Sequence, residues 1–440
     1  MPNVIGNLLV AQSGGPTAVI NASVAGVVVK AKKYRSIKNI YGGANGILGI
    51  LNEDIIDLGQ ETPEAIKSLR HTPSAALGTC RYKIDFKKKP EQAALDMDRL
   101  FEVFKAHNIR FFFYIGGNDS QDTADKVARE AVKRGYDMRV IGIPKTIDND
   151  LPHTDHSPGF GSAAKYVATT VMEVAADISS MATDDGACCV IELMGRGAGW
   201  IAASAVLAKR QSDDAPHIIL LPEVPFDENV FLAKVKETVE RLRYCIVVVG
   251  EGLKKADGSE YSADTNRLDA FGHPVLSGAG DRIVELVSGK LNIKARSLKL
   301  GYAQRCAEHY ASDTDSREAF ACGRAAVDAA IRGKSGFMVK LVRISGTPYK
   351  CAIGLQPLGD IANVEKMIPR DWLSVDGLMP NKKMIDYARP LIEGTVRVPV
   401  EGGLPKFVVL KKTLIARKLP ERGYLPSNAS SHSGQSGNVR

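Results

Sequence analysis

A repeated unit constrains the fold of this chain more than any other feature. It consists of a short apolar run, a glycine-bearing turn and a helical stretch. Such runs end at Gln12, Ile115, Ile143, Glu192 and Val249. Unbroken apolar runs are typical of strands buried on both faces of a parallel sheet, with helices packed on either side. The sequence therefore predicts an α/β fold with mainly parallel, doubly wound sheets, whose ligands bind at the strand ends.

The predicted elements can be given as residue ranges. The strands are 8–12, 37–41, 110–115, 138–143, 187–192, 217–221, 245–249, 294–300 and 337–344. The helices are 17–33, 91–107, 121–134, 160–181 and 313–332. The last residues, 426–440, are rich in serine and glycine, which predicts a disordered tail.

Composition narrows the class of protein. The chain has 440 residues, enough for two or three domains, and its 44% hydrophobic and 25% charged residues are ordinary for a globular protein. The net charge of +8 is dispersed and only 6% of residues are aromatic, so we expect an anionic small substrate and no nucleic acid. The densest basic run, Lys87 to Lys89, is interpreted as a solvated loop.

The sequence gives no indication of a membrane or an oxidising compartment. No apolar run approaches the roughly 18 residues that a membrane span needs, and no signal peptide is evident. The seven cysteines are irregularly spaced and lack a CxxC pair. We therefore expect reduced thiols, a cytoplasmic location and no membrane partner.

The stretch from Ile143 to Asp150 carries the strongest chemical signal. An apolar strand ends there at a proline, and Lys145, Asp148 and Asp150 follow. A lysine at a strand end can hold a phosphate oxygen. One aspartate can accept a proton from a hydroxyl, and the other can bind a metal. The alternative is a surface turn, because Asp and Asn favour turns.

Two glycine turns precede this stretch. Gly14-Gly15 and Gly116-Gly117 each follow a strand and precede a helix, which is an arrangement that points N–H groups at a phosphate. Asp119 comes just after the second turn, where it could act chemically or merely cap the helix. Arg81 could face an anion or solvent.

The second half of the chain offers further polar strand ends. Arg196 and Glu251 both lie between glycines directly after apolar runs, and the 294–300 strand leads to Tyr302 and Arg305. An arginine and a glutamate so placed suit a sugar phosphate and a sugar hydroxyl; turn residues are the alternative. A metal cluster of His153, His156 and nearby aspartates is disfavoured, because the histidines lack helical spacing.

With these motifs in order, the chain resembles the phosphofructokinase family over roughly residues 8 to 370. The motifs are Gly14-Gly15, Gly116-Gly117-Asn118-Asp119-Ser120, Pro144 to Asp150, Met194-Gly195-Arg196, Gly250-Glu251-Gly252, and Gly301-Tyr302 through Arg305. The resemblance implies two Rossmann-like lobes with the active site in the cleft between them. It favours the pyrophosphate-dependent branch, because Asp119 and Lys145 stand where ATP-using members usually have glycine. An aspartate there would crowd and repel a nucleotide phosphate, and a lysine adds a cation where the leaving phosphate develops charge.

The resemblance also implies a role for each motif. The activity is reversible phosphoryl transfer from pyrophosphate to the 1-hydroxyl of fructose 6-phosphate. The implied catalytic residues are Asp148, the base, with Lys145 and Asp119. The implied sugar-phosphate ligands are Thr146, Ile147, Asp150, Met194, Gly195, Arg196, Glu251, Arg296, Tyr302 and Arg305. The implied pyrophosphate ligands are Gly14, Gly15, Arg81, Gly117 and Lys145.

The implied cofactor is Mg²⁺, held by Asn118 or Asp119, with Asp150 as a third option. Residues 1–154 should form a donor-binding lobe and 155–305 a sugar-phosphate-binding lobe, while 306–425 cross back to complete both. We expect a homodimer or homotetramer. Ala187 stands where bacterial ATP-dependent members place one of two interface arginines, so their allosteric tetramer is not assumed. The alternatives are an ATP-dependent enzyme of the same fold and a non-catalytic, sugar-phosphate-binding regulatory subunit.

Overall fold

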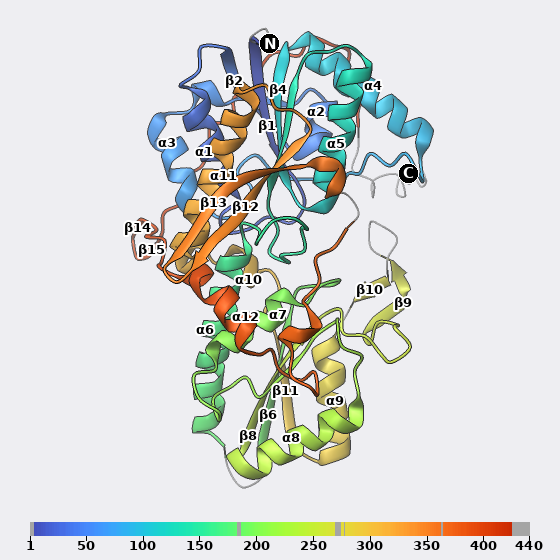
Figure 1. The fold of residues 1–440 in the computed structure, drawn as a ribbon, viewed down its shortest axis with the longest axis vertical. Coiled ribbons are helices and arrows are strands. Elements are labelled where there is room, and N and C mark those ends of the chain that lie inside the picture. Colours follow the sequence, from blue (N-terminus) through green and yellow to red (C-terminus); the bar gives the residue numbers. More distant parts are fainter. Residues whose placement is uncertain (1–3, 183–185, 269–273, 277, 362–363, 425–440) are drawn as a thin grey trace, which may run out of the picture.

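The computed structural model shows two α/β lobes stacked along the long axis of the molecule (Figure 1). It describes residues 4–182, 186–268, 274–276, 278–361 and 364–424. The tail that was predicted to be disordered lies outside these residues. The predicted fold class, an α/β fold with mainly parallel sheets, is confirmed. Within the described chain, no helix is long and apolar enough to cross a membrane.

The first lobe contains a seven-stranded sheet in the order β13-β12-β5-β4-β1-β2-β3. Its strands are β1 (Gly6–Gln12), β2 (Ile37–Gly43), β3 (Ile55–Asp57), β4 (Ile109–Gly116), β5 (Arg139–Pro144), β12 (Phe337–Gly346) and β13 (Tyr349–Pro357). Only the β2–β3 and β12–β13 pairs are antiparallel. Its helices are α1 (Ile20–Ala31), α2 (Gly46–Leu51), α3 (Pro63–Ser68), α4 (Pro90–Ala106), α5 (Asn118–Lys133) and α11 (Asp313–Ile331).

Alternation along the central strands explains why helices cover both faces of this sheet. In β1, Leu8 and Val10 pack into a core with α1 and α11, whereas Leu9 and Ala11 pack into a second core with α4 and α5. Successive strand side chains point to opposite faces, so an unbroken apolar run needs cover on both.

The second lobe contains a four-stranded parallel sheet in the order β11-β6-β8-β7. Its strands are β6 (Ala187–Leu193), β7 (Ile218–Leu220), β8 (Tyr244–Gly250) and β11 (Lys294–Lys299), beside a hairpin of β9 (Ala263–Leu268) and β10 (Pro274–Leu276). Its helices are α6 (Phe160–Ser180), α7 (Trp200–Ser204), α8 (Glu228–Leu242), α9 (Ala279–Leu291), α10 (Ala303–Cys306) and α12 (Lys382–Ala388). On β6, Cys189 and Ile191 face the core under α6 and α7, while Cys188 and Val190 face α8 and α9.

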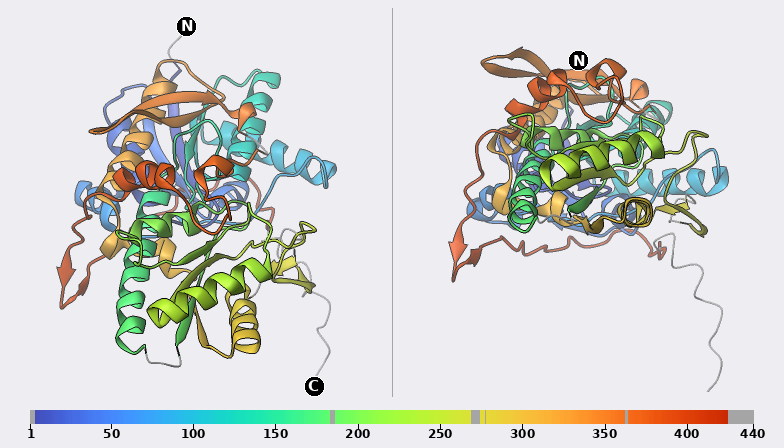
Figure 2. Two further views of the ribbon diagram at one scale, coloured as in Figure 1. Left: turned by 60° about the horizontal axis from the view of Figure 1, so that its bottom comes forward. Right: turned by 90° about the horizontal axis from the view of Figure 1, so that it is seen from below.

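The C-terminal part of the chain contacts both sheets in turn. The β12–β13 hairpin extends the first sheet, α12 packs into the core of the second lobe, and a later segment returns to the first lobe, where Asp57 N donates to Thr413 O at 2.8 Å. The hairpin of β14 (Val400–Glu401) and β15 (Leu404–Pro405) projects from the body of the molecule in every view (Figures 1 and 2).

Helix α1 begins later than predicted. The sequence predicts a start near Thr17, but the helix starts at Ile20. The carbonyl of Thr17 accepts from Ser74 N at 3.1 Å, so it serves the neighbouring loop rather than the helix. In contrast, α5 starts at Asn118, immediately after Gly117. Of the two Gly-Gly turns, the second is therefore followed directly by a helix N-terminus and the first is not.

Candidate active site

A cavity of about 1020 Å³ opens at the carboxyl ends of the strands and takes its lining from both lobes. The lining residues are Gly14, Gly15, Pro16, Arg81, Lys83, Asp85, Lys88, Lys89, Gly117, Asn118, Asp119, Ser120, Lys145, Thr146, Ile147, Asp148, Asp150, Met194, Glu251, Arg305 and Glu365. Because parallel strands end at one edge of a sheet, turns far apart in sequence meet there.

Lys145 lies beside the first glycine turn. The lysine is buried, and its Nζ donates a hydrogen bond to Gly15 O at 2.7 Å. Gly14 has a φ of 73°, a conformation that glycine adopts without strain, which lets the turn come close to this ammonium. Burial lowers the pKa of Lys145 to about 8, against the attraction of Asp148 and Asp150. The cavity thus holds a desolvated cation next to backbone that can approach an anion closely.

Two carboxylates follow Lys145 in the same wall. Burial, with Asp150 and Glu251 nearby, raises the pKa of Asp148 to about 7. Burial also raises the pKa of Asp150, whose Oδ1 has no hydrogen-bond partner. The Thr146 hydroxyl accepts from Asp148 N at 3.1 Å and so fixes the turn between them. A carboxylate that titrates near neutral pH is suited to general base catalysis.

The second glycine turn carries Asn118 and Asp119 at the start of α5. Asn118 Nδ2 donates to Val364 O at 2.6 Å, across to the C-terminal part of the chain. Asp119 is largely exposed and forms an ion pair with Lys83 at 2.6 Å. The charge at this position is therefore that of an ion pair and not of an isolated aspartate, and the role predicted for Asp119 stays a prediction.

The second lobe contributes Met194, Glu251 and Arg305 to the cavity. Gly195 N donates to Glu251 Oε1 at 3.3 Å, which holds that carboxylate at the strand end. Arg305 reaches across to the first lobe, where a Cβ on Gly15 would lie 3.0 Å from Arg305 Nη1. Both glycine turns, the loop from Lys145 to Asp150 (below, the reacting loop) and this arginine therefore face one space.

Four predicted ligands do not line the cavity. They are Gly195, Arg196, Arg296 and Tyr302. Arg196 pairs with Glu260 at 3.2 Å, and Arg296 is exposed on the edge strand β11. Tyr302 is 69% exposed, and its ring lies 4.4 Å from the guanidinium carbon of Arg305. The roles predicted for these residues stay predictions.

Several lining residues were missed by the sequence analysis. Lys88 and Lys89 belong to the run interpreted as a solvated loop; they are exposed, yet they also border the cavity. Lys83 lies two residues after Arg81, so the prediction of Arg81 as an anion ligand could have been extended to Lys83. Glu365 belongs to a stretch without strand or helix periodicity, so nothing in its neighbourhood marked it. Such residues enter the site only through tertiary folding.

The residues that line this cavity are of the kinds that a phosphotransferase uses. Glycine turns and cations can hold phosphates, while a half-buried carboxylate can accept the proton of an attacking hydroxyl. Comparison with known proteins places the chain more narrowly. A family model described as "PFK: Phosphofructokinase" matches residues 7–330.

Similar proteins match along nearly the whole chain. A Halomonas elongata protein named "Pyrophosphate--fructose 6-phosphate 1-phosphotransferase" is 46% identical over 416 residues, covering 94% of this chain and 98% of that protein. The solved structure of a pyrophosphate-dependent phosphofructokinase from Nitrosospira multiformis has a TM-score of 0.87 and 43% identity, covering 96% of this chain and 100% of the other. One from Marinobacter aquaeolei has a TM-score of 0.86 and 42% identity, with the same coverage. This chain belongs to the phosphofructokinase family.

Proposed function

We propose that this enzyme reversibly transfers a phosphoryl group from pyrophosphate to the 1-hydroxyl of fructose 6-phosphate. The products are fructose 1,6-bisphosphate and phosphate. One observation carries the choice of donor: the buried ammonium of Lys145 donates to the carbonyl of Gly15 and shares its cavity with Asp148. The names of the similar proteins agree with this donor and this acceptor.

Asp148 serves as the general base. Its raised pKa, about 7, lets the carboxylate be ionised at neutral pH and still accept a proton from the 1-hydroxyl. Thr146, Ile147, Met194, Glu251 and Arg305 surround the sugar phosphate. The part played by residues 155–305 is accordingly to bind the acceptor.

The donor lies against residues 1–154, which form most of the first lobe. Gly14, Gly15, Gly117 and Arg81 hold the pyrophosphate, and Lys145 supplies positive charge where the leaving phosphate develops negative charge. The Lys83–Asp119 pair fills space in the same cavity and leaves less room for a nucleotide. Catalysis consists mainly of positioning and charge neutralisation.

The site fits a Mg²⁺ ion through Asp150, which leaves Asp148 free to act as the base. Asp150 Oδ1 is buried without a hydrogen-bond partner, which a cation would satisfy, whereas Asp119 is already paired with Lys83. Among the described residues no group of three or more His, Cys, Asp or Glu could hold a metal. Mg²⁺ commonly takes only one or two protein carboxylates, with substrate phosphates and water completing its shell. When bound, it would neutralise charge on the phosphates.

A donor comparison tests the proposal. One preparation is assayed with fructose 6-phosphate and Mg²⁺, first with pyrophosphate and then with ATP. We expect turnover with pyrophosphate only. Turnover with ATP only would keep the fold and the base but overturn the donor assignment, and binding of both substrates without turnover would indicate a regulatory subunit.

Further expectations accompany this proposal. They are a cytoplasmic location and a homodimer or homotetramer, the latter measured by light scattering. A longer sugar such as sedoheptulose 7-phosphate belongs in the same assay, because one extra hydroxymethylene changes binding by only about 1–3 kcal/mol.

A further inference from the structure

The middle residue of the reacting loop is held in an unusual backbone conformation. Asn149, between Asp148 and Asp150, is fully buried and has a φ of 55°. Its amide accounts for this: Ser157 N donates to Oδ1 at 3.0 Å, and Nδ2 donates to the Tyr387 hydroxyl at 2.7 Å. A non-glycine residue keeps such a conformation only where its surroundings fix it. The positions of both reacting carboxylates therefore depend on what holds Asn149.

Lys366 contacts this loop from a distant part of the chain. Its backbone N donates to Asp150 O at 2.7 Å. Its Nζ donates to Asn149 Oδ1 at 3.3 Å, to Asp155 O at 2.9 Å and to Thr154 O at 3.4 Å. One lysine thus ties both residues that follow Asp148 to the segment that supports them.

The neighbours of Lys366 also belong to the cavity wall. Val364 O accepts from Asn118 Nδ2 at the second glycine turn, and Glu365 lines the cavity. This short segment therefore joins the turn at the start of α5 to the reacting loop. It lies between β13 and α12, so its contribution could not be read from either sheet.

The charge of Lys366 fits the same role. The Asp155 and Asp150 carboxylates attract its ammonium, whereas the Arg343 guanidinium repels it. The Asp155 carboxylate is engaged by Arg343 and His156. Asp150, in contrast, has an unpartnered buried oxygen. The Lys366 ammonium therefore adds positive charge close to a carboxylate that has one unpartnered oxygen.

We propose that Lys366 is a positioning residue for phosphoryl transfer, which fixes Asn149 so that Asp148 and Asp150 face the substrates. It does not touch the reacting atoms itself, since it does not line the cavity. This inference rests on the proposed function. It goes further by assigning the active-site geometry to a residue that no motif contains.

The test is a split between turnover and binding in Lys366→Met, which keeps the length of the side chain and removes its charge and donors. We expect kcat to fall by about 10- to 100-fold, because displacement of a reacting group by about 1 Å has an effect of that size. The KM values for pyrophosphate and fructose 6-phosphate should stay within about threefold of wild type, because no substrate contact is removed. Turnover is expressed per binding site, counted by calorimetric titration with fructose 6-phosphate, so that unfolded protein does not lower it.

Lys165→Met is the matched control. Like Lys366, Lys165 ties its own segment to the C-terminal part of the chain through its ammonium, with Nζ donating to Gly394 O and Thr395 Oγ1. It does not contact the reacting loop. We expect it to reduce thermal stability and leave kcat per site unchanged. Tyr387→Phe removes the partner of Asn149 Nδ2 and should lower kcat as Lys366→Met does. It tests whether fixing Asn149 controls turnover if Lys366→Met does not fold.

The outcomes are distinct. If wild type is active and kcat per site is unchanged in Lys366→Met, the role of Lys366 is overturned. If Lys366→Met does not fold, an unchanged kcat per site in Tyr387→Phe overturns the control of turnover through Asn149, on which that role depends. An equal loss of kcat per site in Lys165→Met would likewise overturn the role of Lys366. A wild type without turnover contradicts the proposed function itself.

Discussion

Asp148 and Lys145 show how burial adapts ordinary side chains to phosphoryl transfer. Both are enclosed by the same cavity wall, and in each case desolvation is the largest influence on the pKa. It weakens the acidity of the carboxyl and the basicity of the amine. Each is thereby brought close to neutral pH, where a small change in surroundings changes its protonation.

Asp148→Asn should abolish most turnover while preserving the shape of the loop. The amide is nearly isosteric, but it cannot accept the proton of the 1-hydroxyl. We expect kcat to fall by about two to four orders of magnitude, the usual worth of a general base. Steady-state assay gives kcat, and calorimetry should show that fructose 6-phosphate still binds.

The matched control for this variant is Asp98→Asn on the surface of α4, where Asp98 pairs with Arg134. It should behave as wild type. A near-normal rate for Asp148→Asn would remove Asp148 from the role of base.

Lys145→Met should act on the donor. The variant removes the cation beside Gly15, so we expect kcat/KM for pyrophosphate to fall by about 100-fold or more, as when one donor to a developing anion is lost. No ATP activity should appear, since Asp119 and Lys83 stay in the same cavity. Parallel assays with both donors measure this.

Lys209→Met is a suitable comparison, because Lys209 also donates to carbonyls, those of Ser212 and Asp214, but does not line the cavity. Unchanged pyrophosphate kinetics in Lys145→Met would contradict its assignment to the donor.

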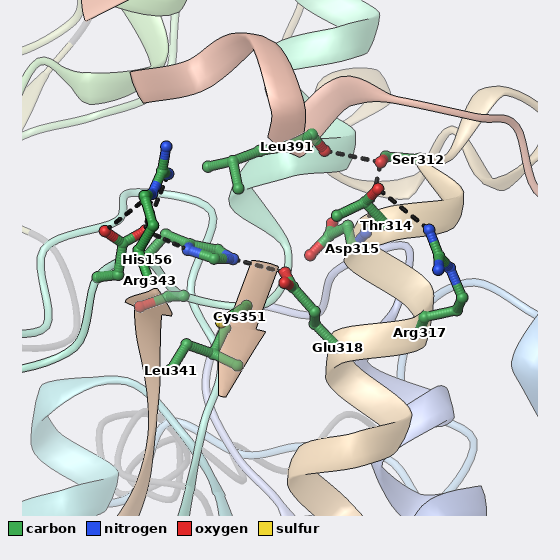
Figure 3. Close-up of polar contacts among 12 residues, drawn as sticks. His156, Ser312, Thr314, Asp315, Arg317, Glu318, Leu341, Arg343, Cys351 and Leu391 are labelled. Carbon is green, nitrogen blue, oxygen red and sulfur yellow. Dashed lines mark hydrogen bonds and ion pairs between the residues drawn. The ribbon is translucent and has the colours of Figure 1, made fainter. Parts of the chain in front are cut away.

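At the scale of elements, one buried network joins the loop after β5 to α11 and the β12–β13 hairpin (Figure 3). His156 contacts Asp155 Oδ2 at 2.7 Å and Glu318 Oε2 at 2.6 Å, and Arg343 binds Asp155 from the hairpin. At the start of α11, Asp315 accepts from Gly159 N and Ser162 N, which caps α6 from another element. Asp155 and His156, two of the residues considered for a metal cluster, are therefore engaged in ion pairs.

His156 should make stability depend on pH. Although burial opposes the charge, Glu318 and Asp155 raise the pKa of His156 to about 9. The folded state then keeps a proton that the unfolded chain loses near its ordinary pKa of about 6.5. The stabilisation is full below about pH 6.5 and is lost as pH rises to about 9, by up to roughly 1.4 kcal/mol per pH unit.

The measurement is the free energy of unfolding of wild type relative to His156→Gln from pH 6.5 to 9. Their difference should shrink as pH rises. His217→Gln is the control, because burial lowers the pKa of His217 to about 4 and that ring is neutral throughout. A constant difference for His156→Gln would show that His156 is not charged in the folded protein.

At the scale of the whole molecule, the cavity exists only where the two lobes meet. Arg305 from α10 lies next to Gly15 of the first lobe. A side chain of the second lobe therefore completes the part of the cavity wall that the first lobe forms. Ligand binding should therefore stabilise both lobes together.

Arg305→Met should reduce this stabilisation. Fructose 6-phosphate at 100 times its Kd raises the free energy of unfolding of a protein by about 2.7 kcal/mol. A tenfold loss of affinity removes about 1.4 kcal/mol of that at the same concentration. Thermal unfolding with and without fructose 6-phosphate measures it, and Arg210→Met, at an exposed arginine, should match wild type. If fructose 6-phosphate stabilises Arg305→Met as much as it stabilises wild type, Arg305 does not bind the sugar phosphate.

The sequence by itself determined the parallel strands, their glycine turns and the reacting loop, because each is a local pattern. Residues Phe111 to Ile115 form an unbroken apolar and aromatic run, which is typical of a strand buried on both faces. Lys145, Asp148 and Asp150 follow another strand end within a few residues. Only the tertiary structure decided what meets these residues. Lys83 opposite Asp119, Lys366 behind Asn149 and the late start of α1 depend on contacts between segments far apart in the chain. No local pattern records such contacts, because they form only when the two lobes and the returning C-terminal segment pack together.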